Sequence, residues 1–223
     1  NKDINTLEAN IEYHLMDNHI LENYLTLIMS SLYFSNNELF NKYERFFIEE
    51  LDEQFLDDGF HFELSIMYHN ILVEKLLNLY SLTEATLING FIDCKYLNLK
   101  LKLLLIKLLR VSHEFRHDDN TLPLFNDTVY SYSRTNKILD YADRLGFKIS
   151  INRSVVSDYK NSGYFKVKEG VYTLFIDAGK IGPKYIPGHG HCDLLSFELS
   201  VDGKKTFTNI GVSTYEYGDR RIL

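Results

Sequence analysis

Residues 188–208 read GHGHCDLLSFELSVDGKKTFT, and this stretch carries the clearest signals of the fold. Polar and apolar side chains alternate over residues 195–201, which is the pattern of a β-strand, and residues 205–208, with two threonines and a phenylalanine, also look like a strand. Between these two runs stand Asp202 and Gly203, a residue pair strongly preferred in two-residue hairpin turns. The stretch therefore predicts an antiparallel β-hairpin near the end of the chain.

Short runs of β-branched and aromatic residues also predict strands over residues 164–167 and 171–176. We expect no strand before Gly163. Before that point, apolar residues recur every three or four positions. This spacing predicts helices over residues 7–16, 19–34, 39–50, 62–80, 97–110 and 136–146. Successive helices with short joints favour stacked helical hairpins.

Helices that precede strands, without alternating with them, predict an α+β chain of two segregated domains, residues 1–155 and 156–223. Four short strands are too few for a sandwich, so we expect the β domain to be incomplete and the chain to be a fragment.

Charge and hydropathy exclude two classes of partner. The formal net charge is −7, whereas a protein that binds nucleic acid needs clustered Lys and Arg. An anionic polysaccharide would need a local positive pocket in such a chain. The longest apolar run, residues 97–109, is interrupted by Lys100, Lys102 and Lys107, so we expect a core helix and no membrane span.

The strongest candidate for chemistry is the pair His189 and His191, which stand two positions apart in a segment with glycine before and between them. Glycine lets the backbone approach a ligand closely. Two such histidines can chelate a metal, or divide catalytic and metal-binding duties. Simple exposure of both rings at the surface remains an alternative.

A second candidate begins at Asp17, where Asp17 or Asn18 is expected to cap a helix. His19 and Glu22 are three residues apart, so they share a helix face and can line a pocket together. A capped helix with a solvated histidine explains the same residues without any function.

A third candidate lies in residues 58–69, where a helix would place Ser65, Tyr68 and His69 on one side. The Tyr68 phenol can act as a base and an acid only if a nearby cation or hydrogen bond lowers its pKa. Tyr68 as a core side chain is the alternative.

Taken together and in this order, these motifs resemble the heparinase II/III family of polysaccharide lyases. The resemblance covers nearly the whole chain. In the helical part it rests on Asn18-His19 and on the pattern Asp-Gly-x-x-x-Glu-x-Ser-x-x-Tyr-His of residues 58–69. In the rest of the chain it rests on three segments: Leu122–Asp127, residues 188–199 and Thr206–Tyr215. It implies an incomplete α/α toroid of helical hairpins followed by a truncated antiparallel β-sandwich.

The resemblance also implies β-elimination in a polysaccharide that contains uronic acid, with a 4,5-unsaturated uronate as product. Asn18 and His19 would hold the substrate carboxylate, Tyr68 would be the acid and also a base, and His189 would be the companion base. Glu22, Glu63 and Tyr215 would be substrate-binding residues. The substrate would be an acidic polysaccharide, such as a glycosaminoglycan or an alginate-like polymer, acted on by a bacterial protein in the periplasm or outside the cell.

Relatives with a structural zinc bind it through the second histidine of the His-x-His pair, a following aspartate and a later histidine. His191 matches the first ligand, but Asn209 stands at the apparent aspartate position and is a poor zinc ligand. We therefore expect no cofactor and no metal in this chain, with zinc at His191 left open for a complete protein. Instead, His191 and Asp193 are expected to share a face of an extended segment and to hydrogen-bond.

Two other functions compete with the lyase. The first is a non-catalytic carbohydrate-binding relative that serves in the assembly of a cell-surface polysaccharide. The second is a metal-dependent hydrolase with His189 and His191 as ligands, although no dense ligand set such as HExxH supports it.

Overall fold

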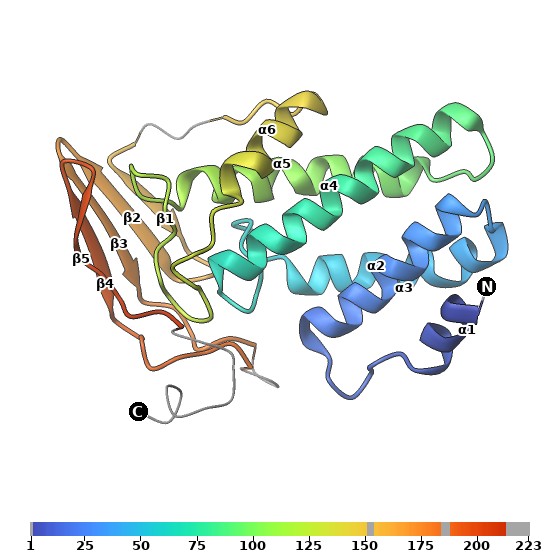
Figure 1. Cartoon of the computed structure of the whole chain (residues 1–223), viewed down its shortest axis with the longest axis horizontal. Coiled ribbons are helices and arrows are strands. Elements are labelled where there is room, and N and C mark those ends of the chain that lie inside the picture. Colours follow the sequence, from blue (N-terminus) through green and yellow to red (C-terminus); the bar gives the residue numbers. More distant parts are fainter. Residues whose placement is uncertain (1, 151–153, 184–187, 213–223) are drawn as a thin grey trace. The chain divides into compact units, whose positions relative to one another are not determined.

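The structure is a computed structural model, and it describes residues 2–150, 154–183 and 188–212. The chain divides into two compact units (Figure 1). The first comprises Asn1–Phe55 and Glu74–Leu105, and the second comprises Leu56–Val73 and Ile106–Leu223. No helix in the described ranges is both long and apolar enough to cross a membrane.

Helices build the first unit. It contains α1 (Lys2–Ala9), α2 (Asp17–Tyr33) and α3 (Asn37–Gln54), with the later part of α4 (Ile66–Asn89) and the first part of α5 (Lys95–Glu114). The helices α2 and α3 pack against each other through buried side chains that recur every three or four residues: Leu21, Leu25, Ile28 and Leu32 of α2, and Phe40, Tyr43, Phe47 and Leu51 of α3. This periodicity is the sequence signal that predicted both helices.

The structure corrects three local predictions in the helical part. The prediction of a helix over residues 7–16 is wrong, because α1 ends at Ala9 and the residues between α1 and α2 form turns and irregular structure. The cap expected from Asp17 or Asn18 is also wrong, because Met16 holds the N-cap position and makes no side-chain cap bond. Finally, the helix expected over residues 62–80 begins later and ends later than predicted, because α4 spans Ile66–Asn89.

The second unit contains α6 (Thr135–Arg144) and one antiparallel sheet in the order β1-β2-β3-β4-β5 (Figure 1). The strands are β1 (Val156–Tyr159), β2 (Tyr164–Glu169), β3 (Tyr172–Asp177), β4 (Phe197–Val201) and β5 (Lys204–Phe207). The hairpin at Asp202 and Gly203 is confirmed, and both residues have the positive φ that a two-residue hairpin turn needs. The expectation of no strand before Gly163 is wrong, because β1 precedes it and pairs with β2.

One face of the sheet is buried in the core of the second unit. Phe115, near the end of α5, has its ring centroid 5.0 Å from Phe60, 5.0 Å from Tyr164 and 4.9 Å from Phe175. Edge-on and tilted contacts of this kind suit the charge distribution of aromatic rings. This aromatic cluster ties the sheet to the segment before α4 and to the end of α5.

The opposite face of the sheet carries a continuous row of apolar side chains. The strand register places Val167 beside Leu174, Leu174 beside Leu199, and Leu199 beside Phe207. All four side chains are half-buried or exposed. A single sheet with one apolar face towards water has the form of half a sandwich.

A buried carboxyl group at the end of β3 affects stability. Asp177 is 4 % exposed, and its Oδ1 accepts the Gly179 N–H at 3.0 Å. Burial raises the pKa of Asp177 from 3.8 to about 6, against the lowering effect of the Gly179 bond, and the nearby Asp193 adds to the rise. The folded state therefore keeps a proton that the unfolded chain releases.

We predict that this carboxyl group makes stability fall as the pH rises from about 4 through 6, by roughly 3 kcal/mol at most. Asp177→Asn keeps the acceptor oxygen and removes the charge, so the variant should lose this part of the pH dependence. Urea unfolding between pH 4 and 7 measures the effect. Asp140→Asn, at an exposed position of α6, is the matched control. Parallel stability curves for wild type and Asp177→Asn would contradict the prediction.

Candidate functional site

The loop at Asn126 joins separate segments of the second unit. The buried Asn126 amide donates from Nδ2 to the Leu64 carbonyl at 3.1 Å and to the Tyr164 hydroxyl at 3.0 Å. Its Oδ1 accepts the backbone N–H of His191 at 3.0 Å, and its own N–H donates to Asp193 Oδ2 at 2.6 Å. Asn126 has φ +51°, a left-handed conformation that asparagine adopts more readily than most residues. One buried side chain thus fixes the segment that contains the histidines.

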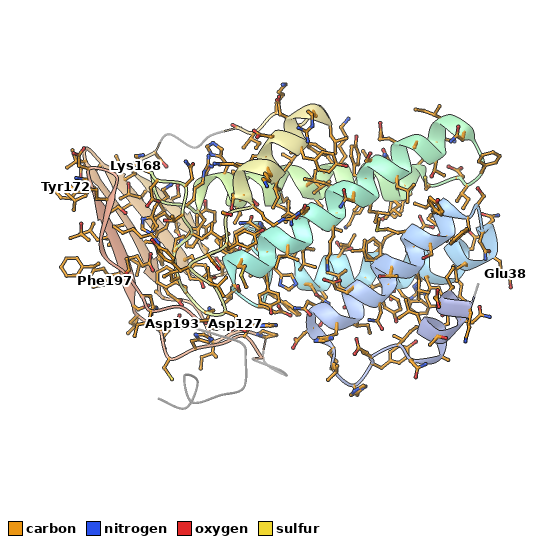
Figure 2. The ribbon with its side chains drawn as sticks, viewed as in Figure 1. Glu38, Asp127, Lys168, Tyr172, Asp193 and Phe197 are labelled. Atoms are coloured by element: carbon orange, nitrogen blue, oxygen red, sulfur yellow. The ribbon has the colours of Figure 1, made fainter. Side chains whose placement is uncertain are left out.

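Asp127 bridges the two histidines. Its Oδ2 lies 2.7 Å from His189 Nδ1, and its Oδ1 lies 2.6 Å from His191 Nε2. Burial by itself raises the pKa of Asp127, but the hydrogen bonds from His189 and His191 outweigh it and hold the pKa below 3.8. The group is therefore a carboxylate at neutral pH, and it fixes the orientation of both rings. Figure 2 shows Asp127 beside Asp193.

Tyr68 lies against His189. Their ring centroids are 4.2 Å apart and their planes are inclined by 40°. The start of α4 is fastened to the Asp127 loop, because Ser65 Oγ donates to the Asp127 carbonyl at 2.8 Å and accepts the Tyr68 N–H at 3.3 Å. The structure thus brings together Tyr68 and His189, two of the predicted catalytic residues. It also places Asp127 in hydrogen-bond contact with His189.

Glu63 is buried on the other side of His189. Its Oε2 lies 3.4 Å from His189 Nε2 and 3.7 Å from His61 Nδ1, and the residue is only 1 % exposed. His189 is therefore held between two carboxyl groups, one at each ring nitrogen. His69, which was expected beside Tyr68 on the same helix side, is buried with Nε2 at 3.1 Å from the Leu108 carbonyl. Burial lowers the pKa of His69 to about 4, so it is a neutral core residue.

The other predicted catalytic and substrate-binding residues are not among the described residues of the second unit. Asn18, His19 and Glu22 lie in the first unit. Asn18 is buried, and His19 is exposed with its Nδ1 at 3.2 Å from Glu12 Oε2. Glu22 forms an ion pair with Lys75. Tyr215 lies outside the described residues.

The residues around His191 do not fit the zinc site that the resemblance implies. His191 Nε2 is bonded to Asp127, and Asn209 Oδ1 accepts the N–H of Ile210 at 2.7 Å. The Asn209 amide group instead donates to Asp193 Oδ2 at 3.4 Å and to Ser196 Oγ at 3.3 Å. Over the described ranges, no three His, Cys, Asp or Glu side chains are placed to hold a metal ion.

The expected hydrogen bond between His191 and Asp193 is wrong. These residues lie in an irregular segment and not in a strand, so the alternation of faces does not apply to them. Asp193 accepts from Asn126 and Asn209, whereas His191 is bonded to Asp127.

Sequence reasoning missed the roles of Asn126 and Asp127. Both residues stand in the Leu122–Asp127 segment that carries part of the resemblance, but no role was assigned to them. Their partners named above are 38 to 67 residues away in sequence, so local spacing gives no hint of the contacts. The one usable signal was a polar Asn-Asp pair directly after a short apolar segment, Leu122–Phe125.

Several solved structures have the same fold. A crystal structure of heparinase III is 18 % identical, with a TM-score of 0.76 over 94 % of this chain and 37 % of that one. A second heparinase III structure, with methylated lysines, is 18 % identical, with a TM-score of 0.73 over 98 % of this chain and 36 % of that one. The heparan sulfate lyase HepC from Pedobacter heparinus is 16 % identical, with a TM-score of 0.65 over 99 % and 36 %. The chain thus spans little more than a third of the length of these proteins. No curated protein sequence matches it significantly.

The fold prediction of α/α toroid helices followed by part of an antiparallel β-sandwich is confirmed by these structures. The division at residues 155 and 156 stays a prediction, because the compact units follow contacts and not family domains. Two family models match the chain: the heparinase II/III N-terminus at residues 7–145 and the heparinase II/III-like C-terminal domain at residues 151–222. The chain therefore belongs to the heparinase II/III family.

Proposed function

We propose that the protein is a polysaccharide lyase that cleaves a polymer containing uronic acid by β-elimination. One observation carries the proposal: a tyrosine and a histidine lie in ring contact, and a carboxylate fixes the orientation of the histidine. A phenol and an imidazole, as in Tyr68 and His189, both have the chemistry to exchange protons with a sugar. Family membership makes a lyase the first reaction to consider.

The proposed reaction makes three chemical demands. A base removes the proton from C5 of the uronate, the bond from C4 to the leaving oxygen breaks, and a C4–C5 double bond forms. An acid protonates the leaving oxygen. Because the C5 proton is only weakly acidic, the adjacent carboxylate must also be neutralised by hydrogen bonds or positive charge.

The geometry around His189 supports the role of a proton-accepting group. Asp127 accepts a hydrogen bond from Nδ1 at 2.7 Å, whereas Nε2 lies 3.4 Å from the Glu63 carboxyl group, so Nε2 is the less tightly held nitrogen and the one that would exchange protons. Tyr68 is half-buried beside it and would protonate the leaving oxygen. A phenol against an imidazole can pass a proton in either direction, which allows Tyr68 to serve as acid and base in turn.

Other roles are proposed from the resemblance. Asn18 and His19 of the first unit would neutralise the substrate carboxylate, and Glu22 and Tyr215 would contact neighbouring sugars. Glu63 was expected to bind substrate, but its burial beside His189 Nε2 favours a different role, that of tuning the charge of the imidazole. We also propose an acidic polysaccharide as partner and a periplasmic or secreted location, which cell fractionation would test.

A non-catalytic carbohydrate-binding relative is the second candidate, because such a protein keeps the same fold and can keep the same residues. The ultraviolet absorbance of an unsaturated uronate separates the two. A protein that carries the whole of this chain is incubated with heparan sulfate, chondroitin, alginate and other polyuronates. Binding without any rise in absorbance would favour the second candidate.

We predict that Tyr68→Phe and His189→Ala each reduce turnover by about 10²-fold or more, because each removes a proton-transfer group. The initial rate of absorbance increase measures the effect, and circular dichroism checks the fold. Tyr130→Phe, at a tyrosine that is 73 % exposed, is the control and should keep its activity. Near-normal turnover in either test variant would remove that residue from the mechanism.

We predict a distinct effect for Asp127→Asn, because Asp127 acts through His189 as a positioning residue. The variant keeps a hydrogen-bond acceptor but loses the negative charge, so the imidazole holds its proton less tightly. The acid limb of the pH–rate profile should move to lower pH by on the order of one unit. A purely structural role would lower activity at every pH and leave that limb in place.

We propose that the chain binds no zinc, because the residues near His191 bond to one another. Elemental analysis of purified protein should give far less than one zinc per chain, and a chelator should leave the melting temperature unchanged. The Asn209→Asp variant is the informative comparison, since it restores the carboxylate. About one zinc per wild-type chain, lost in His191→Ala, would contradict the proposal.

A further inference from the structure

A polar cavity of about 320 Å³ lies in the second unit and shares no residue with the histidine site. It is lined from the end of α5 and the following turn by His113 and Arg116, and from β2 by Lys166 and Lys168. Figure 2 shows Lys168 at the opposite end of the sheet from Asp127 and Asp193. Its volume is at the lower end of the range for small-molecule sites.

The carboxylates that line this cavity are already occupied. Asp118 forms an ion pair with Lys168 and accepts a hydrogen bond from Thr173 Oγ1 at 3.2 Å. Glu114 is buried, and its Oε2 accepts the Tyr159 hydroxyl at 2.7 Å.

Two cations therefore keep unused donors. Lys166 Nζ donates to the Glu114 carbonyl, and no carboxylate of the described residues lies within ion-pair distance of it. Arg116 donates from Nε to the His113 carbonyl at 2.9 Å and from Nη1 to Asn136 Oδ1 at 2.6 Å. A guanidinium has five N–H donors and an ammonium has three, so several stay available for a ligand.

Burial of these positive charges is energetically unfavourable unless an anion compensates them. The pKa of Lys166 is lowered to about 8, chiefly because burial disfavours the ammonium and also because Lys168 repels it. His113 adds a buried Nδ1 that makes no hydrogen bond within the described residues. Partly buried cations are normally paired with an opposite charge.

We propose that this cavity is a binding site for a tetrahedral oxyanion group, sulfate or phosphate, held by Arg116 and Lys166. The donors come from the end of α5 and from β2, so they approach from different directions. A tetrahedral group offers acceptor oxygens in several directions, whereas a carboxylate offers two in one plane. The guanidinium fork also matches two oxygens of such a group at once. The proposal does not depend on the lyase activity.

Binding of inorganic sulfate and phosphate, measured by calorimetry and by the rise in melting temperature, tests the proposal. Chloride and acetate at matched ionic strength are the reference anions. Sulfate or phosphate should stabilise the wild-type protein more than either reference. Arg116→Met and Lys166→Met should each weaken the binding roughly tenfold or more, because each removes a charge-assisted bond. Lys204→Met, at an exposed position of β5, is the matched control and should bind as the wild type does.

A further variant separates a direct effect on anion binding from unfolding of the protein. Asn120 lies on the cavity wall, is exposed and has φ +68°, a conformation that aspartate tolerates. Asn120→Asp adds a negative charge without removing a core contact, and should also weaken sulfate binding. Equal sulfate binding by wild type, Arg116→Met and Asn120→Asp would overturn the proposal, and so would acetate binding as tight as that of sulfate.

The source of the oxyanion can be identified with the same variants. If the group belongs to a polymer, a sulfated oligosaccharide should bind more tightly than its desulfated form, and Arg116→Met should abolish the difference. If the ligand is a free anion, inorganic sulfate or phosphate should bind while the two oligosaccharides behave alike. Both results support an oxyanion site at Arg116 and Lys166.

Discussion

The candidate site depends on a single carboxylate that bonds to two imidazoles. Asp127 reaches His189 with one oxygen and His191 with the other. Its backbone is fixed in turn, because Ser65 at the start of α4 donates to the Asp127 carbonyl and the buried Asn126 precedes it. With Glu63 near the other ring nitrogen of His189, the direction of this ring is fixed, which proton transfer requires.

The acidic groups of the second unit have different environments, and these reconcile the negative net charge of the chain with the acidic substrate that we propose. Asp127 is held as a carboxylate by two histidines, while burial raises the pKa of Asp177 to about 6. Burial also raises the pKa of Glu198, but His117 at 2.7 Å, Lys205 and the Leu124 N–H lower it below 4.5 overall. Such carboxyl groups count in the net charge of −7, yet each of them is hydrogen-bonded within the fold. Net charge is therefore a poor guide to the field at a site.

Regular periodicity and turn chemistry made much of the fold predictable. The helices α2, α3 and α5, and the hairpin at Asp202 and Gly203, follow from spacing and turn residues alone. The strand β1 was missed because its sequence, Val-Ser-Asp-Tyr, has two adjacent polar residues and no alternating pattern, and its pairing with β2 decides its conformation. In the site, Tyr68 and His189 were identified from their motifs, but Asp127 was not, because its contacts span more than 60 residues of sequence.

The central claim, cleavage by elimination, is tested most directly by mass spectrometry of the products formed in water labelled with oxygen-18. Elimination adds no water across the cleaved bond. The account therefore predicts two products whose masses sum to that of the substrate, with no label in either. One labelled oxygen in a product, together with the added mass of one water, would show hydrolysis and contradict the account.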